Sequence, residues 1–147
     1  MLMAVLIAPP VMASASDKTI DVGGKQLKLV EHKEDSIEDI IERGHVHSSI
    51  SGHVDHGEAD AYRRYLSATM RVEITIDHTP TDATGVVLGV CDDDLVYCDY
   101  IIDDNQDGHA HFPDSGTYII TESGYYRIVV GALDGGFSYD GWLDVYW

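Results

Sequence analysis

The sequence predicts an all-β protein, an antiparallel β-sandwich of jelly-roll-like form with one short N-terminal helix. Two observations lead to this prediction. Over residues 46–147, apolar and polar residues alternate with a period of two, most clearly at residues 70–77. The alternating runs are short and are separated by clusters of Gly, Pro, Asp and Ser, which is typical of sandwiches and jelly rolls. The length, 147 residues, is close to that of one average domain.

Residues 1–15 are an apolar run that ends in Met-Ala-Ser-Ala. An apolar segment followed by a small-x-small site is typical of a secretory signal peptide. The run is shorter than the ~20 apolar residues that a membrane-spanning helix needs. We therefore expect export without membrane insertion. No Lys or Arg precedes the run, so either the true start of the signal peptide lies upstream or the segment is a plain apolar arm.

Residues 16–45 form an N-terminal segment ahead of the sandwich. Two extended pieces flank Gly23 and Gly24, which predicts a short hairpin. Residues 35–44 then predict a helix, with capping residues and acids in the first turn, three isoleucines on one face and Gly44 at the end.

The sandwich at residues 46–147 contains the remaining predicted strands. They are expected at residues 49–54, 61–66, 70–77, 85–91, 95–102, 117–121, 125–133 and 139–147. The apolar residues at period two on the best of these strands should form the core. They are Val72, Ile74, Ile76, Val86, Leu88, Ile128, Val130, Leu143 and Val145.

The chain is strongly acidic, since 26 Asp and Glu against 9 Lys and Arg give a net charge of −17. Such a field repels phosphate backbones and anionic lipid, which argues against nucleic acid and membrane surfaces as partners. Between Arg71 and Arg127 there are twelve carboxylates and no Lys or Arg. This local excess favours a bound cation, and a solvated acidic surface is the alternative.

The chain has two cysteines, Cys91 and Cys98. A lone pair in an exported protein predicts a disulfide bond. If Asp94 and Leu95 form the tip of a hairpin, the cysteines lie opposite each other, about 4.5–5.5 Å apart and within disulfide range.

Residues 103–108 read DDNQDG and fit the calcium-loop pattern D-x-D/N-x-D/N-G, with an acid at the twelfth position. Alternate hard oxygens and a Gly for the sharp turn suit calcium. Because no helix pattern flanks the loop, it would lie between strands and would not be an EF-hand. An acidic β-turn is the alternative. The predicted ligands are Asp103, Asn105, Asp107, His109 and Asp114.

Histidines gather at His45, His47, His53 and His56, with His32 nearby. An H-x-H pair on a strand puts both rings on one face, as a zinc or copper site requires. The spacing matches no defined zinc module, so we interpret these histidines as solvated polar residues.

The last strand carries two faces, with Trp142, Asp144 and Tyr146 on one and apolar residues on the other. If the apolar face is core, the first set is a solvent-facing row, extended by Tyr125 on the neighbouring strand. Such a row could bind a polymer chain such as collagen or a glycan. The alternative is that residues 19–41 cover the row as a third layer.

Five motifs occur in a fixed order along the chain. They are an acidic linker at residues 31–36, Ile50-Ser51-Gly52, Gly57–Tyr62, Gly124–Val130 and Gly141–Val145. In order and spacing they resemble the bacterial pre-peptidase C-terminal domain, a small β-sandwich attached to secreted proteases and collagenases. The Pro-Asn of that family's linker motif is absent, and a pair of arginines replaces its aromatic-polar pattern. The resemblance implies a second calcium site, as in related collagen-binding modules, at Glu34, Asp35, Glu58 and Asp60.

No catalytic motif such as G-x-S-x-G or H-E-x-x-H occurs in the sequence, so we do not expect an enzyme. We expect a secreted, calcium-stabilised accessory or binding module that attaches to an extracellular polymer or protein. The alternative is a structural subunit of an extracellular fibre or biofilm matrix that self-assembles through its sheet edges and its N-terminal segment.

Overall fold

The computed structural model describes residues 18–32 and 38–147, so the predicted signal peptide lies outside the described residues. Within the two described ranges there is no α-helix, and thus none that could span a membrane. The same ranges contain twelve strands. They are β1 Thr19–Val22, β2 Lys25–His32, β3 Glu38–Glu42, β4 His45–Val54, β5 Glu58–Leu66, β6 Arg71–Thr79, β7 Val86–Asp92, β8 Cys98–Asp103, β9 His109–Phe112, β10 Tyr118–Ile119, β11 Gly124–Ala132 and β12 Phe137–Tyr146.

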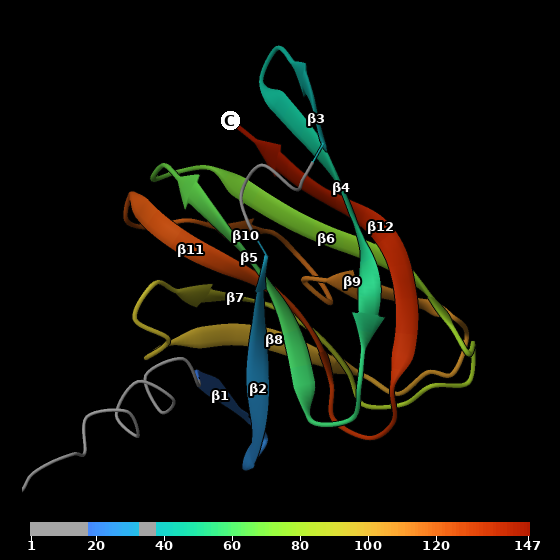
Figure 1. The fold of residues 1–147 in the computed structure, drawn as a ribbon. Coiled ribbons are helices and arrows are strands. Elements are labelled where there is room, and N and C mark those ends of the chain that lie inside the picture. The colour runs from blue at the N-terminus through green and yellow to red at the C-terminus, as the bar shows by residue number, and fades with distance from the viewer. Residues whose placement is uncertain (1–17, 33–37) are drawn as a thin grey trace, which may run out of the picture.

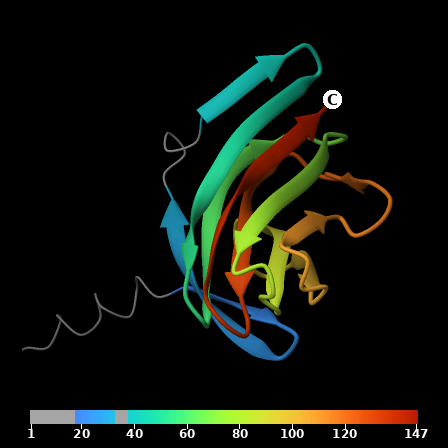
Figure 2. The same cartoon turned by 90° about the vertical axis from the view of Figure 1, so that its right-hand side faces the viewer.

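The strands form two six-stranded sheets packed face to face, so the predicted β-sandwich is confirmed (Figures 1 and 2). Sheet A has the order β1-β2-β5-β11-β7-β8. Sheet B has the order β10-β6-β12-β4-β3, and β9 also pairs with β6. Neighbouring strands are antiparallel except β2 and β5, which are parallel. The N-terminal segment therefore contributes strands to both sheets.

The main core lies between the two sheets and contains all nine residues predicted for it. Val72, Ile74 and Ile76 of β6 are fully buried, and the polar residues between them point outward. Burial of each such side chain contributes about 1.5–3 kcal/mol. Alternation with a period of two was therefore sufficient to assign the inner face of β6.

A second, smaller core lies on the opposite face of sheet A. The β1–β2 hairpin crosses that face, as Figure 1 shows, and buries Ile20, Val22 and Leu27 against β5, β7 and β11. At the hairpin turn the Gly23 amide donates a hydrogen bond of 3.1 Å to the Tyr100 hydroxyl on β8. Residues 19–32 thus belong to sheet A, and no strand in the described ranges forms a further layer over the outer face of sheet B.

The predicted helix at residues 35–44 is wrong, because Glu38–Glu42 forms strand β3, an edge strand of sheet B. Its backbone pairs with β4, from Glu38 opposite Ser49 to Glu42 opposite His45. Gly44 is a hairpin residue with φ +77°, not a helix end. The adjacent β-branched Ile40 and Ile41 suit a strand, and pairing with β4 outweighs the helical spacing of the isoleucines.

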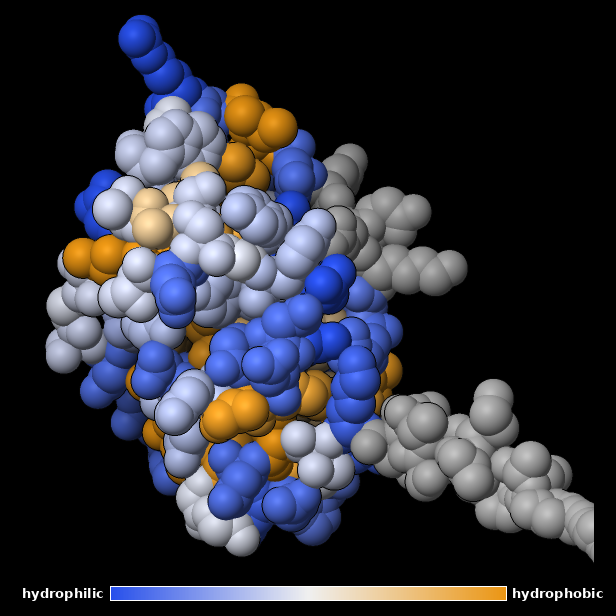
Figure 3. Space-filling view, turned by 90° about the vertical axis from the view of Figure 1, so that its left-hand side faces the viewer, coloured by the Kyte–Doolittle hydropathy of each residue, from blue (hydrophilic) through white to orange (hydrophobic). Residues whose placement is uncertain are grey.

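The face of the molecule seen in Figure 3 is mostly hydrophilic, as expected from the charge of the chain. One apolar patch lies at the top of Figure 3, at the height of the β3–β4 hairpin in Figure 1. Ile40 and Ile41 of β3 are 51% and 72% exposed. This hairpin projects beyond the rest of sheet B, next to the C-terminus (Figure 2).

Candidate functional site

The outer face of sheet B carries the predicted row of Trp142, Asp144 and Tyr146 on β12. The intervening Leu143 and Val145 are buried in the main core, which confirms the assignment of the two faces. Trp142 is 37% exposed. The row therefore lies at the centre of sheet B, with β4 on one side and β6 on the other.

Two histidines of β4 join this row, because the strands pair with His47 opposite Asp144 and His45 opposite Tyr146. The His47 ring stacks on Trp142 with 3.6 Å between ring centroids. The His45 ring stacks on Tyr146 at 4.4 Å, with the two planes only 4° apart. We call these five residues the outer-face cluster. Stacking on neighbouring rings restricts the orientation of both imidazoles.

Asp144 links the two histidines through a single carboxylate oxygen. His45 Nε2 lies 2.7 Å from Asp144 Oδ1, and His47 Nδ1 contacts the same oxygen. Because a carboxylate only accepts hydrogen bonds, each of these ring nitrogens donates an N–H. The three side chains are half-buried, with 24%, 29% and 13% of the side-chain surface of His45, His47 and Asp144 exposed.

Charges around the outer-face cluster are mainly negative. Glu73 of β6 lies opposite Asp144, and Glu42 Oε2 lies 4.0 Å from His45 Nδ1. The Arg71 guanidinium lies over the Tyr146 ring, 5.2 Å from its centroid. Burial and the charges of Asp144 and Glu73 raise the pKa of the Tyr146 hydroxyl, so it stays protonated at neutral pH.

Further along the same face, β9 adds two histidines, each next to a carboxylate. His109 Nδ1 lies 2.5 Å from Asp77 Oδ1, and His111 Nε2 lies 3.7 Å from Glu73 Oε2. The hydrogen bond and charge of Asp77 raise the pKa of the His109 imidazole. The outer face of sheet B is thus a surface of histidines, carboxylates and aromatic rings.

Tyr125 does not extend this row. It lies on β11, which belongs to sheet A and pairs with β5 and β7, so it is not on a strand next to β12. Its ring packs under the Arg63 guanidinium at 3.8 Å and edge-on to Tyr65 at 5.3 Å. The order of the strands, which the sequence did not specify, placed β11 in the other sheet.

The residues predicted as calcium ligands surround one open hollow of about 230 Å³. It is lined by Asp103, Asn105, Asp107, His109 and Asp114, together with Thr75, Ala110 and His111. Two of the carboxylates hold Asx turns, with Asp103 accepting from the Asn105 amide and Asp107 from the His109 amide. Among the described residues, these acids do not form a compact three-ligand group. Calcium binding here stays a prediction.

Of the four residues predicted for the second calcium site, the structure describes two, Glu58 and Asp60. Glu34 and Asp35 lie outside the described residues. Glu58 accepts from the Asp55 amide at 3.3 Å. Asp60 is only 3% exposed and accepts a 2.6 Å hydrogen bond from the Tyr139 hydroxyl. Asp60 is thus part of a buried network between the sheets.

The other histidines of the sequence cluster are spread over the molecule. His53 lies near Asp55 and Ser138, at 3.1 Å and 2.9 Å. His32 of β2 stacks on Tyr62, and its Nε2 lies 3.1 Å from Asp60 Oδ1. Sequence proximity was therefore a poor guide, since only the H-x-H pair stays together.

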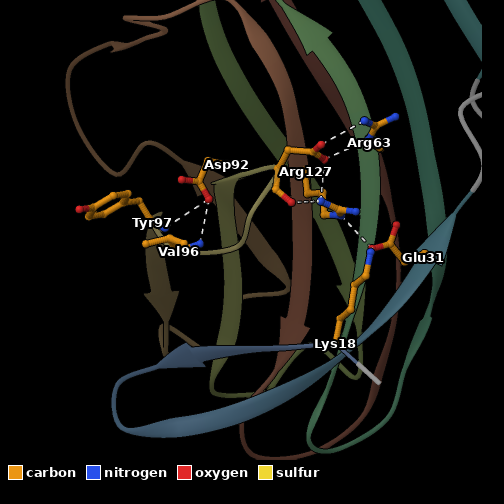
Figure 4. Close-up of polar contacts among 8 residues, drawn as sticks. Lys18, Glu31, Arg63, Asp92, Val96, Tyr97 and Arg127 are labelled. Atoms are coloured by element: carbon orange, nitrogen blue, oxygen red, sulfur yellow. Dashed lines mark hydrogen bonds and ion pairs between the residues drawn. The ribbon is translucent and has the colours of Figure 1, made fainter. Parts of the chain in front are cut away.

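The predicted disulfide between Cys91 and Cys98 is confirmed. The two residues face each other across β7 and β8, with 4.0 Å between their Cα atoms. Beyond them the Asp92 carboxylate accepts from the amides of Val96 and Tyr97 (Figure 4).

The tip of this hairpin is fastened to sheet A by arginines. Arg127, only 5% exposed, lies between Glu31 and Asp93, at 2.8 Å and 2.7 Å (Figure 4). Arg63 forms two 3.0 Å bonds to the same Asp93 carboxylate. The Arg63 hydrogen bonds and the Arg127 charge lower the pKa of Asp93. The stretch between Arg71 and Arg127 contains no Lys or Arg of its own. Arg63 and Arg127 therefore neutralise the Asp93 carboxylate at the tip of its hairpin.

Several solved structures are similar to this fold. PliG from Aeromonas hydrophila, a periplasmic inhibitor of g-type lysozyme, matches with a TM-score of 0.48 and 12% identity over 80% of this chain and 96% of that one. A PliG mutant from Escherichia coli matches with a TM-score of 0.46 and 15% identity, covering 80% and 96% of the two chains. The pre-peptidase C-terminal domain of a Bacillus anthracis collagenase matches with a TM-score of 0.45 and 13% identity, covering 82% and 94%.

The collagenase domain belongs to the family that the sequence motifs resemble. No protein-family model matches the chain, and no curated protein matches it. At these identities and TM-scores the likeness assigns neither a family nor a partner. The function is therefore inferred from the outer-face cluster.

The sequence predicted that the histidines of β4 share one face and that the Trp-Asp-Tyr row of β12 shares another. It did not predict that these two sets of residues contact each other. The H-x-H alternation of β4 and the W-x-D-x-Y alternation of β12 each indicated a polar outer face. The contact between His47 and Asp144 spans 97 positions of the chain. Only the pairing of β4 with β12, which alternation within a strand does not specify, brings them together.

Proposed function

We propose that this chain is an exported, non-catalytic binding module that attaches to an extracellular polymer or protein through the outer face of sheet B. The observation behind the proposal is the outer-face cluster, in which Trp142 and Tyr146 stack on His47 and His45. No other strand of the described part of the chain covers this face. Residues 19–32, which could have formed a covering layer, lie on sheet A.

The chemistry of the cluster suits a chain-like partner. Tyr and Trp offer large contact areas at low cost in conformational entropy, and their polar atoms can bond to the partner. Here the rings are already held by stacking, so binding would order few side chains. Asp144 and Glu73 add acceptors for the hydroxyl or amide groups of a glycan or a collagen-like peptide.

Export is supported by the disulfide bond, since disulfides persist mainly in oxidising compartments. The chain has two cysteines, and both take part in it. A non-catalytic role is supported by the absence of catalytic motifs from the sequence.

Calcium is proposed as a stabilising ion in the hollow lined by Asp103, Asn105, Asp107 and Asp114. Support comes from the position of these four residues in the lining of one open hollow. Calcium takes six to eight oxygen ligands and completes its shell with water where the protein supplies fewer.

Capture on insoluble polymers tests the binding role. The full chain is incubated with fibrillar collagen, peptidoglycan and chitin, and the bound fraction is measured against protein concentration. We expect retention on at least one polymer and at least tenfold weaker retention for Trp142→Ala. Trp147→Ala is the matched control, because Trp147 is also exposed but lies at the end of β12 on the opposite side, next to Leu143 and Val145. Absence of retention on every polymer, or equal retention of all variants, would contradict the proposal.

A structural subunit is the second candidate, and strand β3 favours it. Among the described residues β3 pairs only with β4, and its exposed Ile40 and Ile41 lie at this edge of sheet B. Exposed apolar edge strands are templates for pairing with another chain. Size-exclusion chromatography at rising concentration distinguishes the two roles, because a subunit polymerises and Ile41→Lys suppresses the polymer. An elution volume independent of concentration excludes this role.

A further inference from the structure

We propose that His45, His47 and Asp144 form a binding site for one divalent transition-metal ion, of the class of Zn²⁺ or Cu²⁺. The proposal adds an ion to the face assigned above to partner binding. It rests on the geometry of three side chains and is independent of which polymer, if any, binds there.

The three side chains present a ready ligand set. One ligand atom of each, a ring nitrogen of His45 and of His47 and a carboxylate oxygen of Asp144, lies within 4.8 Å of the other two. His45 Nε2 and His47 Nδ1 are the nitrogens that contact Asp144. Among the described residues no other group of histidines, cysteines and acids meets this condition. Both strands lie inside sheet B, so their backbones are held on both sides by neighbouring strands.

The donor types favour a transition metal over calcium. Imidazole nitrogens suit zinc and copper, whereas calcium prefers oxygen ligands. Zinc lies about 2.0–2.2 Å from such atoms, so tetrahedral ligands are roughly 3.3 Å apart. His45 Nε2 and Asp144 Oδ1 are 2.7 Å apart and need to separate by less than about 1 Å.

Metal binding needs no net loss of protons from neutral imidazoles. When each ring carries one proton, that proton is on the nitrogen that contacts Asp144, because a carboxylate only accepts hydrogen bonds. When the ion takes that nitrogen, the proton moves to the other one, which is Nδ1 in His45 and Nε2 in His47. In His45 this nitrogen lies 4.0 Å from Glu42 Oε2, and a carboxylate there is the usual outer partner of a metal-bound histidine.

The surroundings favour a cation as well. Glu42 and Glu73 flank the site, and the Arg71 guanidinium lies over the neighbouring Tyr146 ring. Because the three ligands are half-buried, the remaining coordination position opens to solvent and is available to water or to a donor atom of a partner. Other pairs on the sheet, such as His109 with Asp77, offer two ligands instead of three.

Calorimetric titration of the metal-free full chain with ZnCl₂ tests the site, in buffer containing millimolar CaCl₂ to fill oxygen-rich sites. We expect one ion per chain, and binding weakened at least tenfold by His47→Phe and by His45→Phe. Phenylalanine keeps a ring stacked on Trp142 or Tyr146 but supplies no ligand. His53→Phe is the matched control, since His53 also lies next to a carboxylate, that of Asp55, but without a third ligand.

Fluorescence gives a second measurement. Trp142 lies 3.6 Å from the His47 ring, so Cu²⁺ bound at the site quenches its emission. In a Trp147→Phe background Trp142 is the single tryptophan. Quenching is expected to saturate at one Cu²⁺ per chain and to require about tenfold more copper once His47→Phe is added. A melting curve shows whether each variant is folded.

Absence of stoichiometric binding in both titrations overturns the inference. Equal affinity of the parent, His45→Phe and His47→Phe does the same. Failure of the parent chain to bind zinc or copper, with its capture on polymer intact, refutes this inference alone. Failure of the parent chain to be captured on any polymer, with its zinc binding intact, refutes the proposed function alone.

Discussion

Replacing Tyr139 with Phe tests the buried network that joins the two sheets. The Tyr139 hydroxyl donates to Asp60 Oδ2 at 2.6 Å and lies 2.5 Å from the Tyr62 hydroxyl. Tyr139 and Asp60 are 4% and 3% exposed, so water does not replace a lost bond. A methyl group on Gly52 would lie 2.8 Å from Asp60 Oδ2, which explains the Gly of the Ile-Ser-Gly motif.

The expected loss in the free energy of unfolding depends on which hydrogen bond the Tyr139 hydroxyl donates. Burial raises the pKa of Tyr139 well above its usual range, and the neighbouring Tyr62 and Asp60 raise it further, so Tyr139 remains a donor. Its single hydrogen goes to Asp60, and Tyr62 donates to Tyr139 or to the Ser51 carbonyl at 3.1 Å. Removing a hydrogen bond to a carboxylate costs about 1.5–3 kcal/mol. The melting temperature should fall by roughly 6–12 °C, at about 4 °C per kcal/mol.

Urea unfolding followed by tryptophan fluorescence measures the free energy of unfolding of Tyr139→Phe. Tyr65→Phe is the control, because Tyr65 is 57% exposed and lies on the same strand as Tyr62. We expect the control to change stability by less than about 0.5 kcal/mol. If Tyr139→Phe also stayed within that range, Asp60 would be satisfied by other partners and the network would not stabilise the sandwich.

Three further predictions concern ions, pH and the disulfide. Calcium at 100 times its dissociation constant should stabilise the fold by about 2.7 kcal/mol, measured as a rise in melting temperature; Asp107→Ala should abolish most of this rise and Asp21→Ala should not. The lowered pKa of Asp93 means that its contribution to stability is complete above the ordinary value of 3.8 and is lost as pH falls through the lowered folded value. Melting curves of Asp93→Asn should thus differ from those of the parent at neutral pH and converge with them in acid; a constant difference would refute this. Intact mass after alkylation without reductant should show no modified Cys91 or Cys98, and two added labels would contradict the disulfide.

The sequence predicted those parts of the fold that depend on local alternation. Val72, Ile74 and Ile76 are apolar at period two. Because successive side chains of a strand point to opposite faces, this alternation determines which face of β6 is buried. The disulfide was predictable for a similar reason, since Cys91 and Cys98 are close enough in sequence for one hairpin to oppose them.

The prediction was wrong or incomplete where pairing with a strand distant in the sequence determines the local structure. Ile40 and Ile41 have helical spacing, yet β4 takes residues 38–42 into sheet B. Strand β9, at His109–Phe112, was not predicted because the acidic pattern before it indicated a loop, and its pairing partner β6 lies about 35 residues earlier. The outer-face cluster depends in the same way on the pairing of β4 with β12.

The central claim is that partners bind at the outer face of sheet B, and the indole signals of the two tryptophans test it most directly. The ¹H–¹⁵N spectrum of the full chain contains one indole N–H for Trp142 and one for Trp147. On addition of a soluble fragment of the polymer that captures the protein, we expect the Trp142 signal to shift or broaden and the Trp147 signal to stay in place. A shift confined to Trp147, or binding that leaves both signals unchanged, would contradict the claim.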